Sequence, residues 1–223
     1  MAKKIYLSPS EQPENLYAYG NTNEKVQCRR ISAVAAEALK RCGFEVIDGK
    51  STTLSARCKE SNEWGADLHV PIHTNAYNGK VSGTRIMCHS LSGEGYKASK
   101  AVYNVLAPMT LGTSENISAN AGLYEVKNTK APCVYIEVDF HDVPRIAKWI
   151  IENTEEIGEA ICKGICNYYG VKYKENMPET SRMYRVFVDN KQLGAFRNVE
   201  YALSMAMEYL NNMDDVHLTV RDK

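Results

Sequence analysis

Short apolar strands alternate with amphipathic helices along the first 170 residues, and this alternation restricts the fold more than any other feature of the chain. It is typical of an α/β sandwich with a largely parallel sheet. The apolar spacing predicts strands at residues 4–9, 44–47, 67–73, 83–89, 123–126 and 133–140, and helices at 21–42, 51–64, 95–107, 143–152 and 155–169. Residues 108–121 are expected to form a loop.

The C-terminal part of the chain carries a different pattern of two strands, a helix near residues 198–211 and a last strand. A polar, proline-containing segment precedes it. We therefore predict a domain at 1–173, a linker at 174–182 and a small ββαβ domain at 183–223. A unit of about 40 residues is small for independent stability.

Charge and apolar content exclude several classes of function. Lys and Arg together number 27, as do Asp and Glu, so we expect no basic surface for nucleic acid or an anionic membrane. No apolar run approaches the roughly 18–20 residues of a membrane span. The opening sequence MAKKIYLSPS lacks the apolar region of a secretory signal, which predicts synthesis in the cytoplasm. The seven cysteines include no Cys-x-x-Cys pair and are interpreted as reduced, buried thiols, with a redox or structural-zinc role as the alternative.

A carboxylate lies in the middle of the most apolar predicted strand, residues 133–140. Side chains alternate between faces along a strand, so Glu137 shares its face with Tyr135 and Asp139, while the opposite face is wholly apolar. A carboxylate in such surroundings is costly unless it is paired, metal-bound or protonated. Glu137 is therefore either a salt-bridged structural residue or a general base in a cleft.

Two further residues point to the same edge of the sheet. His73 ends a predicted strand, where open α/β sheets place their ligands, although a histidine there is often structural. His69 shares its strand face but lies about 13 Å away, too far to bind the same metal ion. Glu24 opens a long helix in register with its buried stripe; alternatively, it belongs to a capping box with Asn21. Together, a His, a Glu and a second Glu could form a catalytic metal site with a nearby base.

These residues lie in segments that resemble the zinc-dependent N-acetylmuramoyl-L-alanine amidases, which cleave peptidoglycan. The matching segments are KIYLSPS, NTNE at 21–24, ADLHVPIHTNA at 66–76 and LYEVKNTKAPCVYIEVDFHD at 123–142. The resemblance covers residues 1–171, is nearest to the SPSxQ-type branch of clostridial and phage lysins, and implies a six-stranded, mostly parallel sheet. It places Glu24 and His73 as Zn²⁺ ligands, Glu137 as the catalytic glutamate, and Asn75 and Lys127 beside the substrate.

The chain departs from the family at the first zinc ligand, which is usually a histidine after the first strand. Here that stretch reads Ser-Pro-Ser-Glu-Gln at residues 8–12. Gln12 is the expected replacement, with Glu11 or His141 as alternatives. An amide oxygen is neutral and binds zinc weakly, so the resemblance implies a weakened metal site.

Three functions follow as hypotheses. The first is a peptidoglycan amidase, as in a phage lysin released to the cell wall or an autolysin. The second is a peptidoglycan-binding module that has lost turnover. The third is a cytosolic α/β enzyme in which Glu137 is structural. The C-terminal segment is similar to part of a SPOR-type wall-binding repeat, in which Phe187, Phe196 and Tyr201 either meet glycan or form the core.

Overall fold

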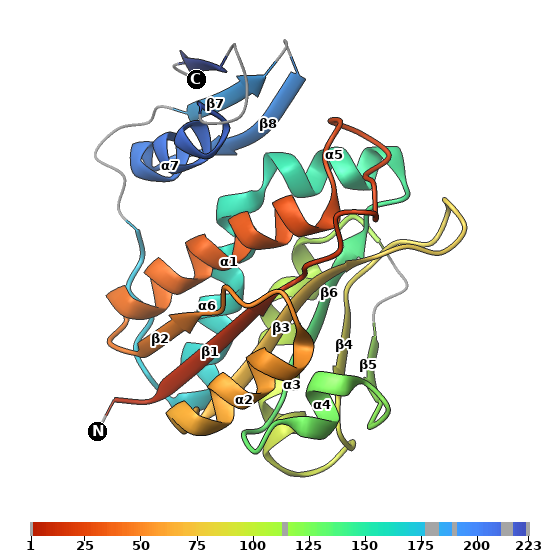
Figure 1. Ribbon diagram of the computed structural model, residues 1–223, viewed down its shortest axis with the longest axis vertical. Coiled ribbons are helices and arrows are strands. Elements are labelled where there is room, and N and C mark those ends of the chain that lie inside the picture. Colours follow the sequence, from red (N-terminus) through yellow and green to blue (C-terminus); the bar gives the residue numbers. More distant parts are fainter. Residues whose placement is uncertain (1, 113–115, 177–182, 189–190, 211–215, 222–223) are drawn as a thin grey trace.

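A six-stranded, mostly parallel sheet forms the centre of the computed structural model, which describes residues 2–112, 116–176, 183–188, 191–210 and 216–221. Its strand order is β2-β1-β3-β6-β4-β5, and only the contact between β4 and β6 is antiparallel. The strands are β1 (Lys4–Pro9), β2 (Glu45–Asp48), β3 (Leu68–Asn75), β4 (Arg85–Cys88), β5 (Asn116–Ala119) and β6 (Tyr135–Phe140). This arrangement confirms the predicted fold class (Figure 1).

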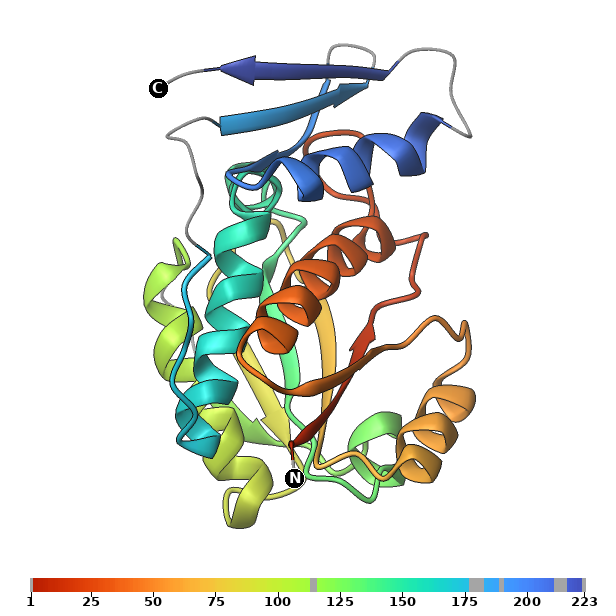
Figure 2. The same ribbon diagram turned by 90° about the vertical axis from the view of Figure 1, so that its left-hand side faces the viewer.

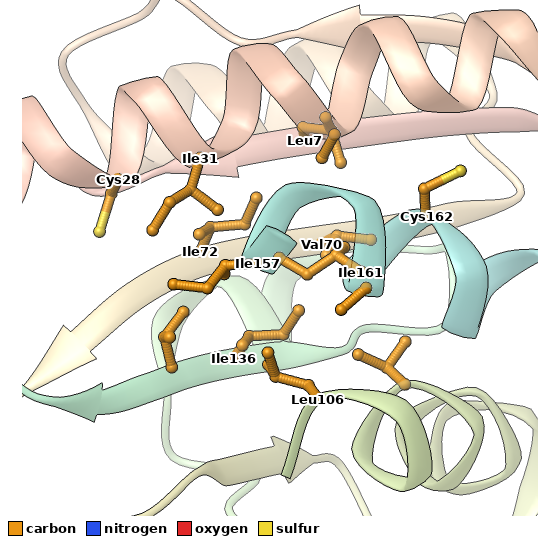
Figure 3. Packing of buried hydrophobic residues seen from close by; sticks show 14 of the residues in the cluster. Leu7, Cys28, Ile31, Val70, Ile72, Leu106, Ile136, Ile157, Ile161 and Cys162 are labelled. Atoms are coloured by element: carbon orange, nitrogen blue, oxygen red, sulfur yellow. The ribbon is translucent and has the colours of Figure 1, made fainter. Parts of the chain in front are cut away.

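Helices cover both faces of this sheet. They are α1 (Glu24–Arg41), α2 (Leu54–Trp64), α3 (Gly93–Leu106), α4 (Tyr124–Asn128), α5 (Pro144–Glu152) and α6 (Thr154–Tyr169), and a 3₁₀ turn, Ala107–Met109, follows α3. On one face α6 packs between α1 and α3, whereas α2 and α4 lie together on the other (Figure 2). The apolar residues of β1, β3 and β6 meet α1, α3 and α6 in the main core (Figure 3).

Two glycines allow α6 to approach its neighbours closely. A Cβ atom at Gly158 would lie 2.6 Å from Val34 of α1, and one at Gly164 would lie 2.5 Å from Val102 of α3. Both distances are far inside van der Waals contact, so any larger residue would push the helices apart. These glycines therefore set the distances from α6 to α1 and to α3 within the helical layer.

The start of α1 differs in detail from the prediction. Asn23, not Asn21, is the N-cap, and its side chain accepts a hydrogen bond from the Val26 N–H at 3.0 Å. Asn21 instead adopts a positive φ of 52° in the preceding turn. The capping-box interpretation of Asn21 and Glu24 is therefore wrong, and the Glu24 side chain is free to point into the sheet edge.

Two local predictions between β4 and β6 were also wrong. The expected loop at 108–121 contains strand β5, which pairs in parallel with β4. The expected strand at 123–126 is part of helix α4, because the Lys127 N–H donates to the Leu123 carbonyl at 2.9 Å and closes a helical turn. Strand β5 was not predicted because the sequence around it is polar. A strand at the edge of a sheet buries little side-chain surface and therefore needs few apolar residues.

Pro71 lies in a central strand, although a proline in a strand predicts an edge or a bulge. Strand β3 lies between β1 and β6, and its pairing with β6 begins at Ile72, directly after the proline, with a register shift between His73 and Asn75. An isolated bridge joins His69 to Cys133 on the other side of Pro71. The sheet thus accommodates the missing N–H by interrupting one ladder.

The C-terminal segment forms the predicted ββαβ unit. Its elements are β7 (Met183–Val188), β8 (Lys191–Phe196), α7 (Val199–Leu210) and β9 (Val216–Arg221), with the antiparallel strand order β8-β7-β9. Phe196 is buried in the core of this unit, and Tyr201 packs against that core, so neither is a free glycan-facing ring. Most of the predicted linker and part of the turn after β7 lie outside the described residues.

The C-terminal unit packs on the rest of the chain over the beginning of α1 (Figures 1 and 2). Arg30 of α1 is buried, donates to the Leu193 carbonyl at 3.0 Å and lies 5.2 Å from the ring centre of Tyr209. Glu155 of α6 accepts hydrogen bonds from the backbone N–H groups of Arg197 and Asn198. Backbone groups of β8 and of the connection between β8 and α7 therefore bind to two helices of the main domain.

Candidate active site

Glu24, His73 and Glu137 converge at the carboxyl end of the parallel strands. His73 and Glu137 are partners in the β3–β6 register, and Glu24 is the first residue of α1. His73 Nδ1 lies 2.7 Å from Glu24 Oε1, and the ring of Tyr135 stacks on the imidazole at 4.7 Å. Three residues far apart in the chain thus meet where α/β sheets bind their ligands.

Glu24 is a buried carboxylate held by hydrogen bonds. Its second oxygen accepts from Asn15 Nδ2 at 2.6 Å. Burial opposes ionisation, but the hydrogen bonds from His73 and Asn15 lower the pKa of Glu24 below its ordinary value. Burial also opposes the charged form of His73, while the bond to Glu24 raises the pKa of the imidazole. The pair therefore favours an ionised Glu24 carboxylate beside a protonated His73 imidazolium.

The Glu137 carboxylate is poised differently. Its Oε2 atom is buried and has no hydrogen-bond partner among the described residues. Burial raises the pKa of Glu137 to about 7, although the nearby His73 and Arg85 oppose this shift. No ion pair of Glu137 within 4.0 Å is seen in the described part of the chain, which argues against a salt-bridged structural role. A carboxyl group with a pKa near neutrality suits general-base chemistry.

Gln12 is the candidate for the third ligand that lies nearest to Glu24. With its amide nitrogen turned toward Glu24, this nitrogen lies 3.0 Å from Oε2 and 3.3 Å from Oε1. Gln12 therefore reaches the Glu24–His73 pair, as an amide that can donate to Glu24 or present its oxygen.

The two alternative candidates for the third ligand, Glu11 and His141, contact other residues. Glu11 forms ion pairs with Lys25, Arg29 and Arg57. His141 Nδ1 lies 2.9 Å from Thr74 Oγ1, and its ring stacks on Tyr17 at 5.0 Å. Within the described chain, neither Glu11 nor His141 lies close enough to both Glu24 and His73 to form a group of three ligand atoms with them.

The two predicted substrate residues lie in different places. Asn75 ends β3 two residues after His73, and its side chain accepts from the Ala76 N–H at 2.8 Å. Lys127 lies on α4, at the end of the sheet opposite to the carboxyl ends of β3 and β6 (Figure 1), and it lines a hollow with His89 and Cys133. The structure therefore brings Asn75 to the site but not Lys127.

Three residues of the site were missed in the sequence. Asn15 binds Glu24, Tyr135 stacks on His73, and Arg85 faces Glu137 in the β4–β6 register. Tyr135 could have been found, because it shares a strand face with Glu137. Asn15 lies in an irregular loop and Arg85 on an antiparallel strand, so no periodic signal links either to the site.

Comparison with known proteins identifies the family. The family model for N-acetylmuramoyl-L-alanine amidase (Amidase_3) matches residues 11–167, a range that includes Glu24, His73 and Glu137. The chain belongs to this amidase family. An uncharacterised 38.4 kDa protein of Clostridium perfringens is 26% identical over 174 residues, which are 74% of this chain and 51% of that protein. The amidase-family chain thus spans about half the length of this relative.

Solved amidases share the fold of the chain. The catalytic domain of CwlV from Bacillus (Paenibacillus) polymyxa var. colistinus has a TM-score of 0.67 at 18% identity, covering 76% of this chain and 99% of that one. An amidase of Clostridium difficile 630 has a TM-score of 0.66 at 20% identity, covering 77% and 98%. The catalytic domain of CD27L, an endolysin targeting Clostridia difficile, has a TM-score of 0.60 at 22% identity, covering 75% and 97%. Among the described helices, none has the length and apolar character needed to cross a membrane.

Proposed function

We propose that this protein hydrolyses the amide bond between N-acetylmuramic acid and L-alanine in peptidoglycan. The observation that carries the proposal is the meeting of Glu24, His73 and Glu137 in a chain of the amidase family. An acidic ligand, a histidine ligand and an unpaired carboxylate beside them are the groups that metal-assisted amide hydrolysis needs.

The metal in this proposal is Zn²⁺, held by Glu24 and His73 with the Gln12 amide oxygen as the third ligand. The donor types fit, because a carboxylate oxygen of Glu24 and the Nδ1 atom of His73 already lie 2.7 Å apart. Catalytic zinc usually has three protein ligands, and an uncharged amide is a weak one. We therefore propose a site that holds zinc more loosely than one with a second histidine.

The chain's own residues divide the chemistry between them. When bound, the ion supplies polarisation of the scissile carbonyl and of a water molecule. Glu137 accepts the proton of the attacking water through its unpaired Oε2 and delivers it to the leaving amine. Arg85 opposes the protonated form of Glu137, and Tyr135 fixes the plane of the His73 ring.

The test is hydrolysis of purified peptidoglycan by the protein after chelator treatment, with and without added Zn²⁺. We expect new L-alanine amino groups to appear only with the metal. Wall binding without any release under any metal would contradict the proposal and support a binding module that has lost turnover. Absence of both wall binding and hydrolysis would contradict any action of this chain on peptidoglycan.

The Gln12→His variant tests the third ligand. An imidazole in place of the amide supplies a stronger zinc ligand at the position closest to Glu24, so zinc affinity should rise by roughly 10–100-fold. The Kd is measured by competition with a chromogenic chelator, and the control is Glu14→His in the same exposed loop. An unchanged Kd in Gln12→His would remove Gln12 from the ligand set.

We also propose that the chain acts as a lysin of the cell wall and that its C-terminal unit, similar to part of a SPOR repeat, binds glycan. The described structure supports this with a cavity of about 600 Å³ between that unit and the loop before α1. Tyr19, Lys148 and the half-buried Phe187 line it. Glu152 also lines the cavity and lies 4.0 Å from Lys148, so it is the aromatic rings, rather than a free positive charge, that suit the face of a sugar.

The Phe187→Ala variant tests the glycan-binding role in the full-length chain. Burying a Phe side chain against a ligand is worth about 1.5–3 kcal/mol, so we expect binding to isolated walls to weaken by roughly tenfold or more. Sedimentation with walls is measured in a Glu137→Gln background so that the walls stay intact. The matched control is Tyr77→Ala, an exposed ring outside this cavity; equal binding by both variants would exclude Phe187 from the wall contact.

A further inference from the structure

Three cysteines from distant parts of the chain meet where the end of α1 packs against α6. Cys42 follows the last residue of α1, and Cys162 and Cys166 lie one turn apart on α6. All three are buried, and Cys162 lies at one end of the main core (Figure 3). Within the described residues, only this trio brings three His, Cys, Asp or Glu ligand atoms within 4.8 Å of one another.

The spacing of the sulfur atoms matches that of a metal–thiolate site. Cys162 Sγ lies 3.8 Å from Cys42 Sγ and 3.9 Å from Cys166 Sγ. Sulfur atoms bound to one zinc ion at about 2.3 Å in a tetrahedron are about 3.8 Å apart. The thiols therefore need little movement to bind one ion, and no carboxylate completes the group to favour a hard cation.

The surroundings of the trio favour thiolates that are compensated by a cation. The Lys174 N–H donates to Cys42 Sγ at 3.3 Å, so this sulfur already accepts a hydrogen bond, as a thiolate does. The carbonyl end of α1 lies beside the trio, and the C-terminal end of a helix attracts positive charge. Arg41 is close, but its guanidinium is engaged by Glu159 and the Lys174 carbonyl.

We propose that Cys42, Cys162 and Cys166 bind a thiophilic metal ion of the Zn²⁺ class, at a site separate from Glu24 and His73. Binding replaces the thiol protons by the metal, and these protons pass to solvent. Access is through Cys42, which is 6% exposed, under the segment that carries Lys174. The bound ion would join the end of α1 to α6, beside the segment that carries Lys174.

The experiment is a titration of the reduced, metal-free, full-length protein with Cd²⁺ alone, which gives an ultraviolet sulfur-to-cadmium charge-transfer band only with thiolate ligands. We expect a band that saturates at one ion per chain and is displaced by Zn²⁺. Cys162→Ser should reduce or abolish it, whereas Cys58→Ser, a buried cysteine outside the trio, should leave it unchanged. No band in the unmodified protein, or a full band in Cys162→Ser, would overturn the proposal.

A second measurement covers the case in which Cys162→Ser fails to fold. Zn²⁺ should raise the Tm of the His73→Ala protein, in which the active-site ligand is removed but the thiol trio is intact. Absence of any Zn²⁺-dependent rise in that variant would also overturn the proposal. Neither measurement uses hydrolytic activity, so the result is independent of the proposed amidase function.

Discussion

Replacing Glu137 by Gln is expected to reduce peptidoglycan hydrolysis by about 10²–10⁴-fold, the usual contribution of a general base. The amide keeps the size of the side chain but cannot accept the proton of the attacking water. Because Glu137 Oε2 has no hydrogen-bond partner among the described residues, the substitution breaks no structural contact there. The release of L-alanine amino groups measures the effect.

Folding and metal content separate a catalytic from a structural role of Glu137. Circular dichroism and bound zinc should stay at the level of the unmodified protein. The control is Glu63→Gln, an equal change at an exposed position of α2, which should leave the rate unaltered. Hydrolysis retained in Glu137→Gln would assign the base to another residue.

Substitution of His73 by Ala is expected to remove hydrolysis and metal binding at the Glu24 site, while the three cysteines keep their capacity for one ion. It deletes one of the two strong ligands that we propose. Loss of a residue that only hydrogen-bonds to a metal ligand typically lowers metal affinity by roughly 10–100-fold, so zinc affinity at this site should fall by at least that factor. It also leaves the buried Glu24 carboxylate without the imidazole at 2.7 Å. A lost partner of this kind costs about 1–3 kcal/mol, so the Tm should fall as well.

Metal analysis and calorimetry test this variant directly. His89→Ala is the matched control. His89 is exposed and follows the last residue of β4, whereas Arg85, which is paired with Glu137, is the first residue of that strand. It should retain zinc and rate. Undiminished zinc in His73→Ala would contradict the ligand assignment even if hydrolysis were lost.

The regular parts of the fold were predictable because they follow apolar periodicity. The two faces of β6 were predicted correctly from alternation alone: Val138 and Phe140 are in the main core, and Tyr135 lies beside His73. Strand β5 and helix α4 were not, since each is short and the chain around them is polar. There the outcome depends on tertiary partners such as β4, which no local pattern encodes.

The candidate site could be predicted in part. The position of His73 at a strand end and of Glu137 mid-strand follow from the sequence, whereas their roles came from the family resemblance. The choice among Glu11, Gln12 and His141 could not be made, because it depends on which cations and rings surround each side chain. The approach of Cys42 to Cys162 across 120 positions is equally invisible without the packing of α1 on α6.

Helix α1 separates the two proposed metal sites. It carries Glu24 at its first residue and ends beside Cys42, and its 18 residues span about 27 Å. Charges separated by several Debye lengths of about 8 Å hardly sense each other in physiological salt. Metal binding at one proposed site should therefore leave the metal affinity of the other unchanged. A chelator should remove the two ions in two independent phases, a fast phase from the Glu24–His73 site and a slow phase from the buried cysteine trio.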